Sequence, residues 1–195
     1  MTLPERAATA PIDDDAVFLQ GPIALRLVRL EDCTERYVAW LEDPEVSRYL
    51  ETRWSRQTLP EVREFITSVR ASLHSHLFAI WRRDTGEHIG NIKIGPINPM
   101  HRYADVSYFI GERSAWGRGY ATAAIRCATR IGFAILGLHR VRAGVYEGNV
   151  ASARALERVG YTLDGTLRRQ MRCEDRWEDL LCYGILAEEF DADEQ

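Results

Sequence analysis

A glycine-punctuated loop between an apolar strand and a long amphipathic helix limits what this chain can fold into and what it can bind. The loop runs from Trp116 to Ala121 and reads Trp-Gly-Arg-Gly-Tyr-Ala. The apolar run 106–110 precedes it, and apolar residues at helical spacing follow over 120–136. Glycines let the backbone approach a ligand closely, and the first amides of a helix have no acceptor within the helix. The helix dipole adds positive potential there, so the pattern predicts a backbone cradle for an anion.

The loop does not match either of the common phosphate-binding motifs. It has no Gly-Lys-Ser/Thr sequence, which excludes a nucleotide-triphosphatase loop, and no third glycine at Rossmann spacing. Taken alone, the six residues also fit a plain loop that starts a helix with glycine.

Periodicity along the chain predicts a single domain of the α+β, or mixed α/β, class, built on a largely antiparallel sheet. A length of 195 residues suits one domain. We expect a flexible segment over 1–18, the domain over 19–190 and an acidic tail over 191–195. The predicted strands are 23–28, 77–81, 89–94, 106–110, 141–146, 161–168 and 177–186, and the predicted helices are 31–42, 46–50, 58–73, 120–136 and 151–159.

Composition narrows the function classes. The net charge of −4 gives no electrostatic footprint for nucleic acid. No apolar run approaches the roughly 20 residues of a membrane span, and the first residues lack the pattern of a signal peptide. The four cysteines and five histidines form no zinc pattern. We therefore expect a cytoplasmic protein with reduced thiols, no metal, and neither a membrane nor a nucleic-acid partner.

Several short segments, in their order and spacing, resemble the GNAT superfamily of acetyl-CoA-dependent N-acetyltransferases, and most closely its RimJ/RimL-type branch. The resemblance covers about 24–190, and the segments that carry it are 25–27, 40–46, 89–92, 104–105, 116–122, 149–152 and 159–161. It implies a seven-stranded, largely antiparallel sheet whose central strand pair, around 108–110 and 145–146, splays apart between flanking helices. It also implies that pantetheine lies in the gap as a pseudo-strand and that a strand amide near 109–110 stabilises the oxyanion.

The resemblance also implies which residues contact acetyl-CoA. Backbone amides of 117–122 hold the pyrophosphate, and Trp116 occupies the first position of the family's signature. Asn149 matches a residue whose amide touches pantetheine, although asparagine there also suits an N-terminal helix cap. The implied acetyl-CoA contacts are Phe109, Ile110, Trp116, Gly117, Arg118, Gly119, Tyr120, Ala121, Thr122 and Asn149.

For catalysis, the resemblance assigns Ser152 as the proton donor to the leaving thiolate; the alternative is a capping or surface serine. Many relatives carry a tyrosine acid where this chain has Leu156, and the branch's glutamate base falls near Met171, which cannot accept a proton. A carboxylate is still a suitable acceptor for the amine's proton. Asp105 is the first candidate, and Glu147 and Glu51 are weaker ones.

The predicted function is acetyl transfer from acetyl-CoA to a primary amine, by direct attack through a tetrahedral intermediate. Small amines or amino sugars and protein N-termini rank equally as acceptors, and the protein is expected to be a monomer or homodimer. A non-catalytic acyl-CoA-binding module is the alternative. We expect an acceptor site flanked by Arg53, Trp54 and His101. The arginines at 168, 169 and 172 fit either a solvated face paired with 174 and 175 or an anion-binding cluster.

Overall fold

One sheet of eight strands organises the structure, a computed structural model that describes residues 11–191. The strand order is β1-β2-β3-β4-β5-β6-β8-β7, and every neighbouring pair is antiparallel except β5 with β6. The bounds are β1 Val17–Gln20, β2 Ile23–Leu27, β3 His76–Arg82, β4 His88–Asn98, β5 Tyr103–Ile110, β6 Arg140–Tyr146, β7 Thr162–Cys173 and β8 Arg176–Leu186.

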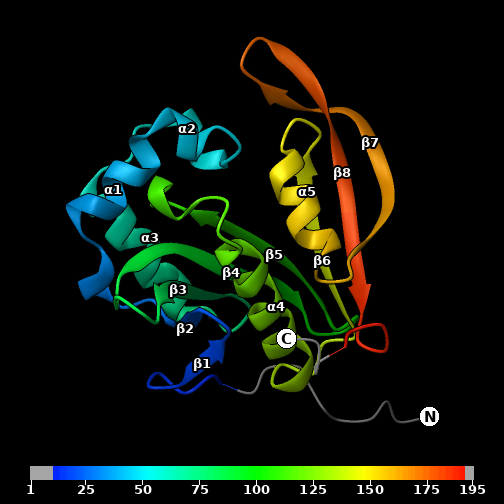
Figure 1. The fold of residues 1–195 in the computed structure, drawn as a ribbon, viewed down its shortest axis with the longest axis horizontal. Coiled ribbons are helices and arrows are strands. Elements are labelled where there is room, and N and C mark those ends of the chain that lie inside the picture. Colours follow the sequence, from blue (N-terminus) through cyan, green and yellow to red (C-terminus); the bar gives the residue numbers. More distant parts are fainter. Residues whose placement is uncertain (1–10, 192–195) are drawn as a thin grey trace.

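Helices cover both faces of the sheet (Figure 1). The 15-residue helix α4 packs with α5 against one face, and the N-terminal helices pack against the other. The bounds are α1 Glu35–Glu42, α2 Pro44–Ser47, α3 Leu59–Ala71, α4 Tyr120–Ala134 and α5 Val150–Glu157, with short 3-10 turns η1 Leu30–Asp32, η2 Glu51–Trp54 and η3 Arg113–Ala115. This arrangement confirms the predicted α+β class.

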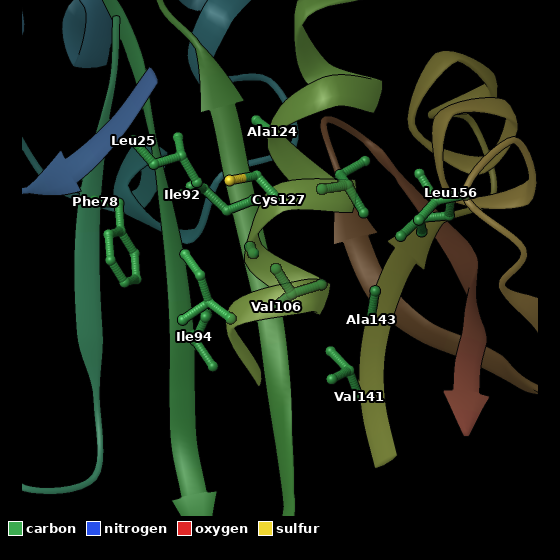
Figure 2. Close-up of a cluster of buried hydrophobic side chains, with 14 of the residues drawn as sticks. Leu25, Phe78, Ile92, Ile94, Val106, Ala124, Cys127, Val141, Ala143 and Leu156 are labelled. Carbon is green, nitrogen blue, oxygen red and sulfur yellow. The ribbon is translucent and has the colours of Figure 1, made fainter. Parts of the chain in front are cut away.

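The alternation of side chains along the strands divides the interior into two cores. On β3, Phe78 and Ile80 enter the core beneath α4, whereas Leu77 and Ala79 enter the core beneath α3. Figure 2 shows the first of these cores, in which the small α4 side chains Ala124 and Cys127 lie over the branched residues of the central strands. Small residues on that helix face bring α4 close to the sheet.

Local signals in the sequence explain where most helices begin. The backbone N–H of Thr58 donates to Glu61 at 2.8 Å, so the predicted capping box starts α3. The region 31–42, predicted as one helix, instead divides at Thr34. The Thr34 side chain accepts from the N–H of Tyr37 and caps α1, which separates η1 from it.

The N-terminal part of the domain holds a strand that the sequence pattern did not predict. Val17 and Phe18, placed within the flexible segment 1–18, belong to β1, which pairs with β2 along its whole length. The guanidinium of Arg130 on α4 donates to the Leu19 carbonyl at 2.7 Å and holds the strand in place. The sheet therefore has eight strands rather than seven. Residues 1–10 and 192–195 lie outside the described residues, and the predictions for them stay predictions.

The central strands β5 and β6 pair over only three positions. Their register joins Tyr103–Asp105 to Arg140–Arg142, after which β5 continues to Ile110 and β6 to Tyr146 without pairing. Each strand keeps its other neighbour throughout, β4 for β5 and β8 for β6. The predicted splay is therefore present, and the gap opens toward the carboxyl ends of both strands.

Within residues 11–191, no helix has the length and apolar character needed to cross a membrane. The same part of the chain holds no group of three or more candidate ligands for a metal ion. The four cysteines are free thiols, three of them buried.

A buried histidine links α1 to the sheet. His88, which is 9% exposed, meets the ring of Trp40 on α1 edge-on and stacks on Trp81 of β3, with ring centroids 5.1 and 5.2 Å away. Its Nε2 lies 2.9 Å from the Gly90 carbonyl and 3.1 Å from Asn91 Oδ1. Burial lowers the pKa of His88 below its ordinary 6.5, although the carboxylate of Asp32 acts in the opposite direction.

We predict that the fold loses stability as the pH falls below about 6.5, the ordinary histidine pKa. The unfolded chain then takes up a proton at His88 that the folded chain binds less readily, so the free energy of unfolding decreases as the pH falls. One such proton contributes a slope of up to about 1.4 kcal/mol per pH unit. Urea unfolding of wild type and His88→Gln between pH 5 and 7.5 measures this slope. Equal slopes in the two proteins would exclude His88 as its source.

Candidate active site at the splayed strands

The gap between β5 and β6 is lined by backbone groups without a sheet partner. The N–H of Gly111 donates to the Ile89 carbonyl on β4, which sets the alternation along β5. Successive residues of a strand direct their N–H and C=O groups to opposite sides, so Tyr108 and Ile110 direct theirs toward β6. By the same alternation along β6, the backbone N–H and C=O of Gly144 face the gap. The gap therefore presents donors and acceptors at the spacing of a strand.

Phe109 and Ile110, both predicted to contact acetyl-CoA, therefore direct their backbone groups to opposite sides of β5. Ile110 directs its backbone into the gap. Phe109 pairs with Asn91 on β4, and its ring packs against Tyr37 and Trp40 in the core beneath α3. The geometry favours Ile110 as the contact and gives Phe109 a packing role.

The glycine loop has the conformation predicted for the anion cradle. Gly117 and Gly119 have φ angles of +72° and +80°, in the left-handed region, and a Cβ at either position would meet no atom within 4 Å. Gly119 is the N-cap of α4, no side chain caps the first turn, and that turn carries no acidic residue. The amides of Tyr120, Ala121 and Thr122 therefore face the open side of the loop.

Two side chains of the loop have partners within the domain. The indole Nε1 of Trp116 donates to the Ile110 carbonyl at 2.7 Å, which ties the loop to the rim of the gap. Tyr120 is 7% exposed, with its ring in the core and the guanidinium of Arg82 above it. Arg118 is exposed.

Across the gap, the loop after β6 places Asn149 and Ser152. Asn149 Oδ1 accepts from the Ser152 N–H at 3.3 Å, so this asparagine caps α5, which was the alternative role considered for it. Its backbone N–H donates to the Tyr146 carbonyl at 2.8 Å. Only the side-chain Nδ2 remains for pantetheine. The Ser152 hydroxyl lies 2.8 Å from that of Tyr108 on β5.

Asp105 lies at the closed end of the gap and has an ion-pair partner. Arg142 donates to both of its carboxylate oxygens, at 3.0 and 3.2 Å. These two residues form the last paired position of β5 and β6. Tyr146 lies four residues further along β6, or about 13 Å away at the usual rise of a strand. Asp105 therefore joins the two strands at the closed end of the gap, away from its open end.

Glu51 occupies the open end instead. The Tyr146 hydroxyl donates to its Oε1 at 2.5 Å, and the Trp54 indole donates to its Oε2 at 3.3 Å. The carboxylate side chain is 66% exposed. Burial and the neighbouring carboxylate raise the pKa of Tyr146, so its phenol stays protonated.

Arg53 holds this arrangement together. Its guanidinium donates at 2.7 Å to three acceptors, the carbonyls of Leu50 and Arg172 and the hydroxyl of Tyr146. It also lies over the rings of Trp54 and Tyr146. The segment η2 and the β7–β8 hairpin thus form two walls beside the open end.

Glu178 is a site residue that the sequence analysis missed. It is 3% exposed, accepts from the Gly148 N–H at 3.0 Å and binds Arg176 at 2.5 Å. Its pKa is lowered because the bonds from Arg176 and Gly148 favour the charged form and outweigh burial. Glu178 fixes the loop that leads to Asn149. A single acidic residue in a strand with no motif around it gives no signal for this role.

The structure gives His101 and Glu174 neighbours other than those that the sequence analysis expected. His101 stacks on Tyr103 in the turn before β5, at the closed end of the gap, because that turn lies at the opposite end of the strand from Ile110. Glu174 pairs with Arg48 rather than with the arginine cluster. The cluster residues Arg168, Arg169 and Arg172 are exposed, and the first two lie where the β7–β8 register shifts.

Residues 23–162 match the acetyltransferase (GNAT) domain model. The chain belongs to the GNAT family. It is an acetyl-CoA-dependent N-acetyltransferase of that family, with the family's fold around the splayed strands.

Relatives and solved structures cover nearly the whole chain. YoaA of Bacillus subtilis, an uncharacterised N-acetyltransferase, is 31% identical over 84% of this chain and 93% of its own. Spermidine N-acetyltransferase from Vibrio cholerae, solved with CoA and spermine, is 20% identical with a TM-score of 0.77, over 86% and 97% of the two chains. RimJ from Mycobacterium smegmatis, in complex with CoA-disulfide, is 25% identical with a TM-score of 0.76, over 89% and 87%.

We predict that Gly119→Glu reduces CoA affinity by more than tenfold, because its carboxylate would stand among the amides that face the anion. The substitution also forces a side chain into a left-handed conformation, which costs about 1–2 kcal/mol. Gly137→Glu is the matched control, since Gly137 has φ +62° and open space but follows the other end of α4. Thermal unfolding and calorimetric titration with CoA should show similar stability losses and an affinity loss for Gly119→Glu alone. Unchanged affinity in folded Gly119→Glu would refute the cradle.

Proposed function

We propose that the protein transfers the acetyl group of acetyl-CoA to the neutral form of a primary amine, with the amine entering at Glu51 and the thiol leaving toward Ser152. The observation that carries this proposal is the position of these two groups on opposite faces of the splayed strands. An acid and a base on opposite sides of a thioester suit attack from one side and departure on the other.

Strand alternation establishes the two sides. Tyr108 belongs to the β5 row that packs against α4, and its partner Ser152 lies on α5, which covers the same face. Tyr146 belongs to the other row of β6, since Val145 enters the core beneath α4. Its partner Glu51 therefore lies on the opposite face.

The acetyl donor would bind along the gap. The amides of 117–122 would hold the pyrophosphate, as anions bind at helix N-termini. Pantetheine would extend the sheet between β5 and β6, in contact with the Asn149 side chain. The N–H of Ile110 would stabilise the tetrahedral oxyanion, since it faces the gap and a positioned backbone donor lowers the energy of that charge.

Glu51 is the proposed base in place of Asp105. Attack requires the amine without its extra proton, and a carboxylate in contact with it, directly or through water, can take that proton. Glu51 is exposed at the open end, whereas Asp105 forms an ion pair with Arg142 at the closed end. The Tyr146 and Trp54 donors hold the Glu51 carboxylate in one orientation.

A primary amine on a small molecule or a protein N-terminus fits this site. The exposed aromatic surface of Trp54 and the carboxylate of Glu51 suit a cationic acceptor before it loses its proton. The likeness to RimJ supports a place in the RimJ/RimL-type branch. The Vibrio cholerae spermidine enzyme supports small amines as acceptors. CoA release across amino sugars, polyamines and N-terminal peptides tests the proposal, and no release with any amine would favour a non-catalytic acyl-CoA-binding module.

We predict that Glu51→Gln lowers turnover at pH 7 by about 100-fold, the usual contribution of a positioned base. The deficit should narrow toward pH 9, because more of the amine is already neutral there. Asp105→Asn is the matched change in the other carboxylate and should keep near wild-type turnover. pH profiles at saturating acetyl-CoA measure both. A large loss in Asp105→Asn with none in Glu51→Gln would return the role to Asp105.

A second prediction concerns the acid. Ser152→Ala should lower kcat, by about 100-fold if the hydroxyl donates in the transition state, and should leave acetyl-CoA affinity unchanged. Single-turnover kinetics and CoA titration separate the two effects. An unchanged rate for the chemical step would mean that water protonates the thiolate.

A further inference from the structure

The hydroxyls of Tyr108 and Ser152 form a pair that spans the open part of the gap. Tyr108 lies on β5, beyond the last position that pairs with β6, and Ser152 lies on the first turn of α5. The two oxygen atoms are 2.8 Å apart. The contact joins residues 44 positions apart, so the sequence of the glycine loop gives no signal for it.

The surroundings of Tyr108 make its phenol a hydrogen-bond donor. Its ring packs against the core beneath α4. Burial raises its pKa to about 12, so the hydroxyl keeps its proton at neutral pH. Ser152 is the partner of the Tyr108 hydroxyl within the described residues, and either oxygen can donate in this bond. The arrangement relevant to catalysis is the one in which the phenol donates to Ser152 Oγ.

This bond determines where the proton of Ser152 points. A serine hydroxyl without such a partner is free to turn toward solvent or a nearby backbone carbonyl, which would direct its proton away from a ligand in the gap. When the phenol donates to Ser152 Oγ, the serine's own hydrogen is directed elsewhere, and the gap lies beside it. The bond also makes the serine a better donor, since it supports the negative charge that develops on Oγ.

The chain has no phenol at the position where the family resemblance would place one. Leu156, one turn further along α5, is fully buried in the core. A phenol nevertheless reaches the first turn of α5, from the opposite wall of the gap. We propose that Tyr108 is the positioning residue that orients Ser152 for proton donation to the leaving thiolate, a role that rests on the proposed function.

The proton transfers balance in this scheme. As the amine nitrogen forms a bond to the carbonyl carbon, its proton passes to Glu51 and then to solvent. As the C–S bond breaks, its electron pair goes to sulfur, which takes the proton of Ser152. The serine oxygen stays hydrogen-bonded to the phenol and regains a proton from water.

Tyr108→Phe, Ser152→Ala and the double variant test the proposal by their kcat and their KM for acetyl-CoA. We expect Tyr108→Phe to lower kcat by about tenfold or more, which is part of the roughly 100-fold contribution of a positioned acid, with KM within about twofold of wild type. The double variant should be no slower than Ser152→Ala, because residues that act as one unit are not additive.

Tyr161→Phe is the matched control. Tyr161 is also a buried phenol in the same core, but its hydroxyl pairs with Thr129, at 2.7 Å. It should keep the wild-type kcat, while thermal unfolding shows a stability loss similar to that of Tyr108→Phe. Tyr108→Thr, which removes the ring and cannot reach Ser152, should match Tyr108→Phe in kcat if it folds.

The possible outcomes separate the two proposals. An active wild type with an equally active Tyr108→Phe would overturn the positioning role and leave the proposed function standing. Additive losses in the double variant, or a Tyr161→Phe as slow as Tyr108→Phe, would show a general packing effect and would also overturn it. A wild type that transfers no acetyl group to any amine would overturn the proposed function and this inference with it.

Discussion

The site depends on the separation of β5 from β6. Each strand stays paired with its neighbour on the outer side, so separating the two strands removes only the hydrogen bonds between them. The exposed backbone groups still need partners, because unpaired groups away from water are costly. The Trp116 indole satisfies the Ile110 carbonyl, and the Asn149 N–H satisfies the Tyr146 carbonyl. The other groups that face the gap, such as those of Tyr108 and Gly144, are available to water or to an extended ligand.

The parallel relation of β5 and β6 explains why cradle and gap lie together. Antiparallel neighbours need only a turn, but parallel neighbours need a crossover, and here the crossover is α4. A helix that follows β5 directly begins beside the carboxyl end of that strand. The same end of the sheet is where the strands part. One topological feature thus brings the helix N-terminus, the free strand amides and α5 to one place.

Local patterns in the sequence predicted most of the fold, and long-range contacts explain what they missed. The capping box at Thr58 and the left-handed glycines of the loop are signals contained within a few residues. β1 is only four residues long and follows an acidic stretch, and its pairing with β2 and α4 determines its structure. The arginine partner of Asp105 and the tyrosine partners of Ser152 and Glu51 are 37 to 95 positions away. No local pattern encodes such distances, so the family resemblance indicated a serine but not what orients it.

The three bonds of Arg53 have a consequence for how this enzyme can change its acceptor. One planar guanidinium joins η2, the end of β6 and the hairpin, and a lysine ammonium could not reproduce that fixed geometry. A substitution that moves the Arg172 carbonyl would therefore reach Glu51 through Arg53 and Tyr146. Natural variation of acceptor preference in such a scaffold would proceed by coordinated changes in η2 and the hairpin. A single substitution at either wall would more often disorder that wall than admit a new substrate.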